Sequence, residues 1–171
     1  MQMADYLDKF QKTATGLNKH YFDSAGLHFK VGEWLGCAVL KIQKPSWCNK
    51  PPEGKPFERS IFFSIWVSAE GIQHNRLYYN IHALKLRELN QYKIQSREFA
   101  QAFRNRLGPY AINWPNLSTN YGPLTLMQGW VELDKLEEEV PKLCYSFKPI
   151  AIIIDELLTE RKKQILSISY F

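Results

Sequence analysis

Cysteine is scarce in this sequence, and its few positions are far apart. Cys37, Cys48 and Cys144 are the only three in 171 residues, and no two of them form a CxxC pair. An odd number of widely separated cysteines indicates neither a disulfide framework nor a zinc knuckle. We therefore expect reduced thiols that pack as small apolar side chains.

Long apolar runs are missing as well. No stretch approaches the roughly eighteen apolar residues of a membrane-spanning helix. The opening residues, MQMADYLDKF, carry acidic groups where a signal peptide would have a basic flank and an apolar run. Both absences predict a cytoplasmic protein that makes no contact with a membrane.

The sequence also lacks the spacing patterns of common catalytic sites. Its histidines show no HExxH arrangement, and no GxSxG elbow or glycine-rich phosphate loop follows a predicted strand. The acidic triplet at 137–139 would spread around a helix, which favours a solvated helix start over a cation site. We therefore predict no catalytic residue, no metal site and no cofactor, and we favour a protein without enzymatic activity.

The patterns that are present indicate both helices and strands. Apolar residues recur every three or four positions in four segments, which predicts helices at 4–22, 96–107, 134–145 and 149–163. Apolar and polar residues alternate in five others, which predicts strands at 27–31, 37–43, 61–67, 76–86 and 124–131. The isoleucine run in 149–163 leaves a strand open as an alternative there.

Glycine and proline mark the expected boundaries between these segments. We expect turns at 32–36 and 71–75, and a break at Gly129 in the last strand. Pro141 is expected to interrupt one helix, and Pro149 suits the first position of another.

The order of the segments predicts the architecture. Short links between neighbouring strands favour an antiparallel sheet of about five strands, with the helices packed on one face. This is a two-layer α+β sandwich, and we expect residues 1–171 to form a single globular domain. A change of alternation near Ala83 indicates a bulge or the start of a helix at that point.

A surface loop rich in proline and charge is expected at 44–59. Loops of this length inside a compact domain are often functional or disordered. The loop contains Trp47, which suits either an anchor that packs the loop onto the body or a ring that stacks on a ligand. We favour the anchor.

Positive charge is concentrated in one stretch of the chain. Residues 76–106 contain seven basic side chains and two acidic ones, a surplus of five, which equals the formal net charge of +5 for the whole protein. If this surplus is also gathered in space, the protein has a basic pole that attracts anionic partners.

Polar and aromatic side chains share one face of the hairpin expected from 61–67 and 76–86. On the second strand they sit at every second position, opposite an apolar face that includes Ile61 and Phe63. The following helix adds arginines on the side away from its apolar stripe. The candidate binding residues are Trp66, Arg76, Tyr78, Asn80, His82, Arg97 and Arg104.

Several functions fit a basic, aromatic surface of this kind. Basic groups neutralise phosphates and rings stack on unpaired bases, so we expect a binding protein that contacts single-stranded nucleic acid or an acidic protein. A small anion and an ordinary solvated sheet face are open alternatives. A further alternative is a nucleic-acid-processing enzyme whose carboxylates come from remote segments and converge near His82.

Overall fold

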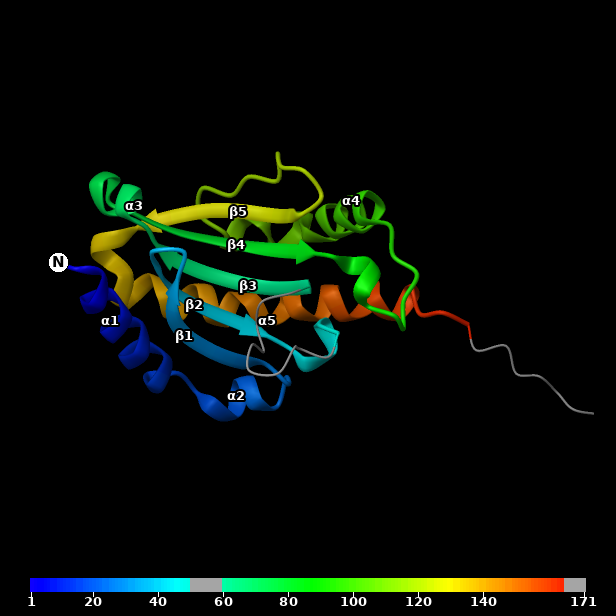
Figure 1. Cartoon of the computed structure of the whole chain (residues 1–171), viewed down its shortest axis with the longest axis horizontal. Coiled ribbons are helices and arrows are strands. Elements are labelled where there is room, and N and C mark those ends of the chain that lie inside the picture. Colours follow the sequence, from blue (N-terminus) through cyan, green and yellow to red (C-terminus); the bar gives the residue numbers. More distant parts are fainter. Residues whose placement is uncertain (50–59, 165–171) are drawn as a thin grey trace, which may run out of the picture.

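The computed structural model describes residues 1–49 and 60–164. A five-stranded antiparallel sheet lies at its centre, with the strands side by side in chain order (Figure 1). The strands are β1 (His28–Trp34), β2 (Cys37–Gln43), β3 (Ser60–Val67), β4 (Arg76–Leu84) and β5 (Thr125–Glu132). The prediction of an α+β fold built on an antiparallel sheet is confirmed.

Helices cover one face of this sheet. The α-helices are α1 (Met3–Gly16), α2 (Lys19–Asp23), α3 (Ala69–His74), α4 (Ser96–Leu107) and α5 (Leu136–Glu160). The short 3-10 helices are η1 (Pro45–Trp47), η2 (Leu86–Glu88), η3 (Gly108–Asn113) and η4 (Leu133–Lys135). α5 runs behind the strands along the length of the sheet, and α1 and α4 pack beside it (Figure 1). Within the described ranges, no helix is both long and apolar enough to cross a membrane.

The core lies between the sheet and α5. Leu40, Phe63 and Tyr79, from three neighbouring strands, are fully buried against the helical layer. Phe63 stacks on Phe147 of α5, with the ring centroids 4.5 Å apart. Burial of a large apolar side chain contributes about 1.5–3 kcal/mol. Because successive strand residues point to opposite faces, the side chains between these positions are turned away from the helices.

The predicted interruption of the last helical region is wrong. α5 continues through both Pro141 and Pro149, and the alternative of a strand at 149–163 is wrong as well. A proline inside a helix removes one hydrogen bond and costs roughly 3 kcal/mol. A continuous buried stripe along α5 outweighs this cost. Its members include Leu136, Val140, Leu143, Cys144, Phe147, Ile150, Ile154 and Leu157.

The hydrogen bond that Pro149 removes is replaced from another helix. Without an amide proton, Pro149 leaves the carbonyl of Tyr145, four residues earlier, without its helical donor. The Tyr21 hydroxyl of α2 lies 3.5 Å from that carbonyl and donates to it. The helix predicted at 4–22 is in turn two helices, because Asn18 caps α2 by accepting from the amide of Tyr21 at 3.2 Å.

β1 is longer than predicted. The turn expected at 32–36 shrinks to Leu35 and Gly36, whose φ angles are +50° and +75°. Two successive positive φ angles are typical of the tight hairpin turn whose twist matches the flanking strands. Trp34 consequently pairs with Cys37 as a strand residue.

The link between β3 and β4 is a short helix, where a turn was predicted at 71–75. Ser68 caps α3, since its hydroxyl accepts from the amide of Gly71 at 3.0 Å. β4 then changes register against β5 between Ile81 and His82, and the chain enters η2 at Leu86. Both alternatives raised for the region near Ala83, a bulge and the start of a helix, therefore occur close together.

The predicted break of the last strand at Gly129 is also wrong, because β5 is continuous. A Cβ at Gly129 would overlap the Tyr79 hydroxyl, which donates to the carbonyl of Pro115 at 2.6 Å. The glycine therefore makes room for a buried tyrosine.

The loop tryptophan is an anchor. Trp47 is fully buried, and its indole nitrogen donates to the Asp155 carboxylate of α5 at 2.8 Å. Lys44 forms an ion pair with the same carboxylate at 2.5 Å. Residues 50–59 of the loop predicted at 44–59 lie outside the described residues.

Candidate binding site on the open sheet face

The sheet face turned away from α5 carries the candidate site. In the described part of the chain, α1, α4 and α5 all lie on the other face (Figure 1). We call this surface the open face. Side chains on it come from every second position of each strand.

The strand registers align polar side chains across the whole open face. We call this alignment the polar row. It consists of Lys30, Lys41, Ser64, Asn80 and Gln128, one residue from each strand. Ammonium groups stand at its β1 end, and a hydroxyl and two amides occupy the other three positions. The row therefore changes from positive charge to neutral hydrogen-bonding groups.

Aromatic side chains occupy the neighbouring positions on three strands. Trp66, Tyr78 and Trp130 pair across β3, β4 and β5, and we call them the ring row. The rings of Trp66 and Tyr78 stack with centroids 5.4 Å apart and planes inclined by 23°. The Arg76 guanidinium lies 4.3 Å from the Trp130 ring centre. All three rings are only half-buried, so each keeps part of its surface open to solvent.

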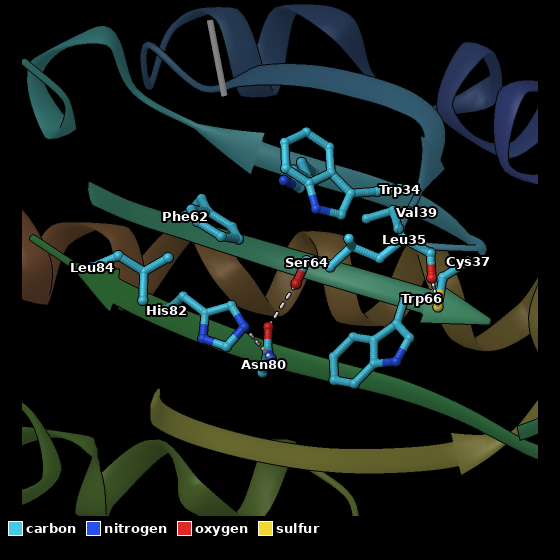
Figure 2. A pocket seen from close by; sticks show the side chains of 11 residues that line it. Trp34, Leu35, Cys37, Val39, Phe62, Ser64, Trp66, Asn80, His82 and Leu84 are labelled. Atoms are coloured by element: carbon cyan, nitrogen blue, oxygen red, sulfur yellow. Dashed lines mark hydrogen bonds between the residues drawn. The ribbon is translucent and has the colours of Figure 1, made fainter. Parts of the chain in front are cut away.

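A hollow of about 280 Å³ opens over the polar row, with Trp66 on one side, Phe62 and His82 on the other, and the tip of the β1–β2 hairpin at its edge. Its aromatic lining comes from Trp34, Phe62 and Trp66, and its polar lining from Lys41, Ser64, Asn80 and His82. Figure 2 shows the side chains standing on the sheet around a common space, with Asn80 joined to Ser64 and His82. The hollow thus has ring walls and a polar floor.

The lysine of the hollow is held between two rings. The Lys41 ammonium lies 3.7 Å from the Trp34 ring centre and 4.5 Å from that of Phe62. Only 6% of the residue is exposed. Cation–π contacts of this kind contribute about 0.5–2 kcal/mol each, and they fix the position of the charge.

The polar floor is a chain of three hydrogen bonds. The Ser64 hydroxyl donates to the Asn80 side-chain oxygen at 2.6 Å, and the Asn80 amide nitrogen lies 3.0 Å from Nε2 of His82. Nδ1 of His82 lies 3.3 Å from the carbonyl of Leu124. Because a carbonyl can only accept, Nδ1 carries the proton and Nε2 accepts from Asn80. The geometry therefore holds His82 in one neutral tautomer.

The electrostatics of His82 agree with that assignment. Burial lowers the pKa of His82 below its usual 6.5, and the nearby Lys41 charge lowers it further, while the hydrogen bond to Leu124 acts in the opposite direction. Protonated His82 would also turn an Nε2–H toward the Asn80 amide, which is itself a donor.

Five of the seven candidate residues meet on the open face. Trp66, Asn80 and His82 line the hollow, Tyr78 stacks on Trp66, and Arg76 covers Trp130. The predicted pairing of the two strands is confirmed, since Ser64 is opposite Asn80 and Trp66 is opposite Tyr78. Their role in binding stays a prediction.

The two arginines of the helix are not part of this group. Arg97 and Arg104 lie on α4, which packs in the helical layer. Arg104 donates to four backbone carbonyls at 2.9–3.1 Å, those of Tyr121, Gly122, Thr125 and Leu126. Its hydrogen bonds serve the fold, so the structure separates it from the open face.

The expected pole of positive charge is divided in the same way. Arg106 pairs with Glu160 at 2.6 Å and with Glu156 at 3.8 Å, while Arg76 lies on the open face. Arg76 and Arg106 therefore lie in different layers, and a single basic surface formed by the whole stretch stays a prediction.

Sequence reasoning missed Trp34, Lys41, Phe62 and Trp130 as members of the site. The positions of Lys41 and Phe62 on the open face follow from alternation once the order of the strands is known. Trp34 lies on the same face of β1 as Lys30, and it was missed because the turn was predicted to begin three residues too early, at residue 32. Trp130 lies two residues after Gln128 in β5 and therefore points to the same face of the sheet.

No acidic side chain lines the hollow among residues 1–49 and 60–164. Over the same residues, no three metal-ligating side chains gather into a cluster. The described partners of His82 are an amide, a hydroxyl and a carbonyl. The arrangement can stack rings, exchange hydrogen bonds and present a cation.

No protein-family model matches this chain, and no curated protein or solved structure is significantly similar to it.

Proposed function

We propose that this protein binds single-stranded nucleic acid on the open face. The observation that carries the proposal is the ring row beside the polar row: half-buried rings on three adjacent strands next to a line of cations, hydroxyl and amides. Unpaired bases need flat surfaces, and their edges and phosphates need donors, acceptors and positive charge.

The rings supply the larger part of the expected affinity. Stacking of a base on an aromatic side chain contributes about 1–3 kcal/mol. Trp66, Tyr78 and Trp130 lie on neighbouring strands, which are about 4.8 Å apart. Because Trp66 and Tyr78 stack on each other and Arg76 lies over Trp130, a base would stack on the part of each ring that these contacts leave exposed.

The charges on this face supply a smaller, salt-sensitive part. Lys30, Lys41 and Arg76 are the basic residues of this face that the described strands supply. Among the described acidic residues, Glu132 pairs with Lys135 at 3.0 Å, and Glu33 lines a second hollow together with Lys30 and Lys41. At most three phosphate contacts on a single strand predict a slope no steeper than roughly −2 in the logarithmic dependence of affinity on salt. A slope of this size distinguishes the proposal from binding through all seven cations of the basic stretch.

A binding protein accounts for the site better than an enzyme does. The described lining of the hollow brings no carboxylate to His82, and His82 is held neutral with both nitrogens engaged. A general base needs an accessible nitrogen and a nearby reacting group. The rings, hydrogen-bonding groups and cation of the hollow can bind a ligand without a reaction taking place.

The test is fluorescence anisotropy with a labelled single-stranded oligonucleotide of about eight nucleotides, a length within the range of one such surface. We expect binding at low salt that weakens with a slope no steeper than roughly −2 as salt is raised. A polyglutamate peptide serves as the competing anion. Absence of oligonucleotide binding at low salt, or stronger binding of polyglutamate, contradicts the proposal and points to an acidic protein as the partner.

A further inference from the structure

We propose that binding of nucleic acid on the open face is coupled to the uptake of a proton by His82, so that the protein holds its single strand more tightly as the pH falls. This inference rests on the proposed function and adds a means of regulating it. Three observations carry it: the place of His82 in the hollow, the reversible hydrogen bonds around its ring and the nearby charge of Lys41.

His82 lies where a charge on its ring would act on a ligand. The residue lines the hollow and is half-buried, so part of it is open to solvent. Its ring packs edge-on against Phe62, with the ring centroids 5.3 Å apart, and the Lys41 ammonium lies 4.5 Å from the centre of the same Phe62 ring. An imidazolium at this position would add a second positive charge to the hollow beside that of Lys41.

Nε2 of His82 is the nitrogen that can take up the proton. Nδ1 already carries one, because it lies 3.3 Å from the Leu124 carbonyl, and the Thr125 hydroxyl is 3.3 Å from the same nitrogen. Nε2 accepts from the Asn80 amide nitrogen at 3.0 Å. A proton on Nε2 would face an N–H group of that amide, which is unfavourable unless the amide turns over.

The Asn80 amide can turn over and keep both of its partners. A half-turn exchanges its oxygen and nitrogen, so the oxygen would accept from Nε2–H of His82 and the nitrogen would face the Ser64 hydroxyl. A hydroxyl can accept as well as donate, so Ser64 suits either orientation. Of these two neighbours, only His82 distinguishes the orientations. Protonation therefore requires the rotation of one amide and one hydroxyl, and the backbone can stay in place.

Burial and a neighbouring charge keep His82 neutral in the free protein. Burial is the largest cause of the lowered pKa of His82, the hydrogen bond to the Leu124 carbonyl opposes it, and the Lys41 charge adds to it. A phosphate that approaches Lys41 is an opposite charge for both groups, so it favours the protonated imidazole. By linkage, a ligand that favours the protonated form binds more tightly where that form is populated.

The surroundings of His82 contain one charge of known effect. Among the described residues, its ring faces Phe62 from β3, Asn80 from its own strand, and Thr125 with the Leu124 carbonyl from the β5 side. Lys41 of β2 is the charged neighbour that acts on the ring. The described lining of the hollow includes no carboxylate that could hold the proton without a ligand.

The direction of the pH effect identifies the part of the strand that lies beside His82. A phosphate there favours the imidazolium, and affinity rises as the pH falls. A base that covered the ring would bury it further, which disfavours the imidazolium and lowers affinity as the pH falls. Because Trp66 and Tyr78 supply the rings for stacking, we place a phosphate beside Lys41 and His82.

The experiment measures the affinity for an oligothymidylate of about eight nucleotides by anisotropy, at about pH 7.5 and about pH 5.5 and at one low salt concentration. Thymine takes up no proton in this range, so the charge of the ligand is constant. We expect about fivefold tighter binding at the lower pH, the stronger end of the range for one exposed ion pair. Equal or weaker binding at the lower pH overturns this inference and leaves the proposed function standing. Absence of binding at both pH values overturns both.

A second measurement observes His82 itself and needs no variant. Nitrogen NMR of the unmodified protein should show the proton on Nδ1 near neutral pH, and the pKa of His82 should rise when the protein is saturated with oligothymidylate. A His82 pKa that stays the same or falls on saturation overturns the inference.

Matched glutamine variants assign the proton to one histidine. His82→Gln keeps a side chain that can accept from Asn80 but takes up no proton, so the ratio of the two affinities should fall from about five to about one, whatever affinity remains. His28→Gln removes the other histidine of the open face, exposed on β1 opposite Gln43, and should keep the ratio. A ratio that persists in folded His82→Gln, or that disappears in His28→Gln, overturns the inference.

Discussion

The strand half and the helix half of the basic stretch 76–106 lie in opposite layers of the molecule. In β4, Arg76 shares the open face with Asn80 and His82. In α4, Arg104 is bound to backbone carbonyls and Arg106 to acidic side chains of α5. Proximity in sequence therefore says little about the availability of a charge. The carbonyls and carboxylates that a side chain meets decide whether it can contact a partner.

The largest expected effect of substituting these arginines is on the free energy of unfolding. Arg104→Ala leaves four carbonyls without a charged donor, and we expect a loss of about 2–4 kcal/mol in the free energy of unfolding, measured by urea denaturation. Arg97→Ala on the exposed side of the same helix should change it by less than about 0.5 kcal/mol. Similar values for the two variants would mean that the carbonyl contacts of Arg104 contribute little.

The next effect is on binding by the ring row. Trp66→Ala removes a ring that belongs to both the hollow and the ring row, and we expect a loss of about 1–3 kcal/mol in oligonucleotide affinity. Tyr110→Ala removes an exposed ring from η3 and serves as the control. Equal losses for the two rings, by anisotropy titration, would remove the open face from the proposal.

The next smaller effect is on the salt dependence of binding, which distinguishes an arginine on the open face from one on α4. Arg76→Ala should reduce the salt slope of oligonucleotide binding by about 0.7, the value for one phosphate contact on a single strand. Arg97→Ala should leave the slope unchanged, although both variants remove one positive charge. If both slopes fall alike, the long-range field of the protein governs binding and the position of the charge does not.

The smallest effect is the dependence of stability on pH through His82. Its pKa is lowered in the folded protein by burial and by Lys41, so the unfolded chain takes up the proton first as the pH falls. The stabilising contribution is therefore present above a pH of about 6.5 and is lost as the pH falls through the folded pKa.

This dependence is measured from urea midpoints on either side of that pH. His82→Gln should flatten the decline relative to the unmodified protein, because glutamine does not titrate. Asn80, Thr125 and the Leu124 carbonyl contact the ring, and Lys41 is the nearby charge that lowers its pKa. An unchanged decline in the variant would assign the pH dependence to other groups.

Much of the sheet could be predicted from the sequence, because alternation is a local property. The bounds of β2 agree with the prediction, and alternation in two neighbouring strands predicts that Ser64 and Asn80 share a face. The register that places them opposite each other could not be predicted in this way. The shared face of Trp66, Tyr78 and His82 could be predicted for the same reason.

The errors arise where distant residues decide the local structure. Pro149 looks like a helix start in sequence, yet the stripe of α5 that packs on the sheet keeps the helix continuous. Gly129 looks like a break, yet it makes room for Tyr79. Arg104 looks exposed on its helix, yet four carbonyls of a later segment surround it. Local periodicity contains no information about these contacts.

The position of α5 has a consequence for synthesis. Since a ribosome makes the chain from its amino end, all five strands are complete before the helix that covers their apolar face exists. Until then Leu40, Phe63 and Tyr79 have no partner layer, and the nascent sheet is at risk of aggregation. We expect a nascent chain halted before Leu136 to need a chaperone, and release of α5 from the exit tunnel to be the event that completes folding.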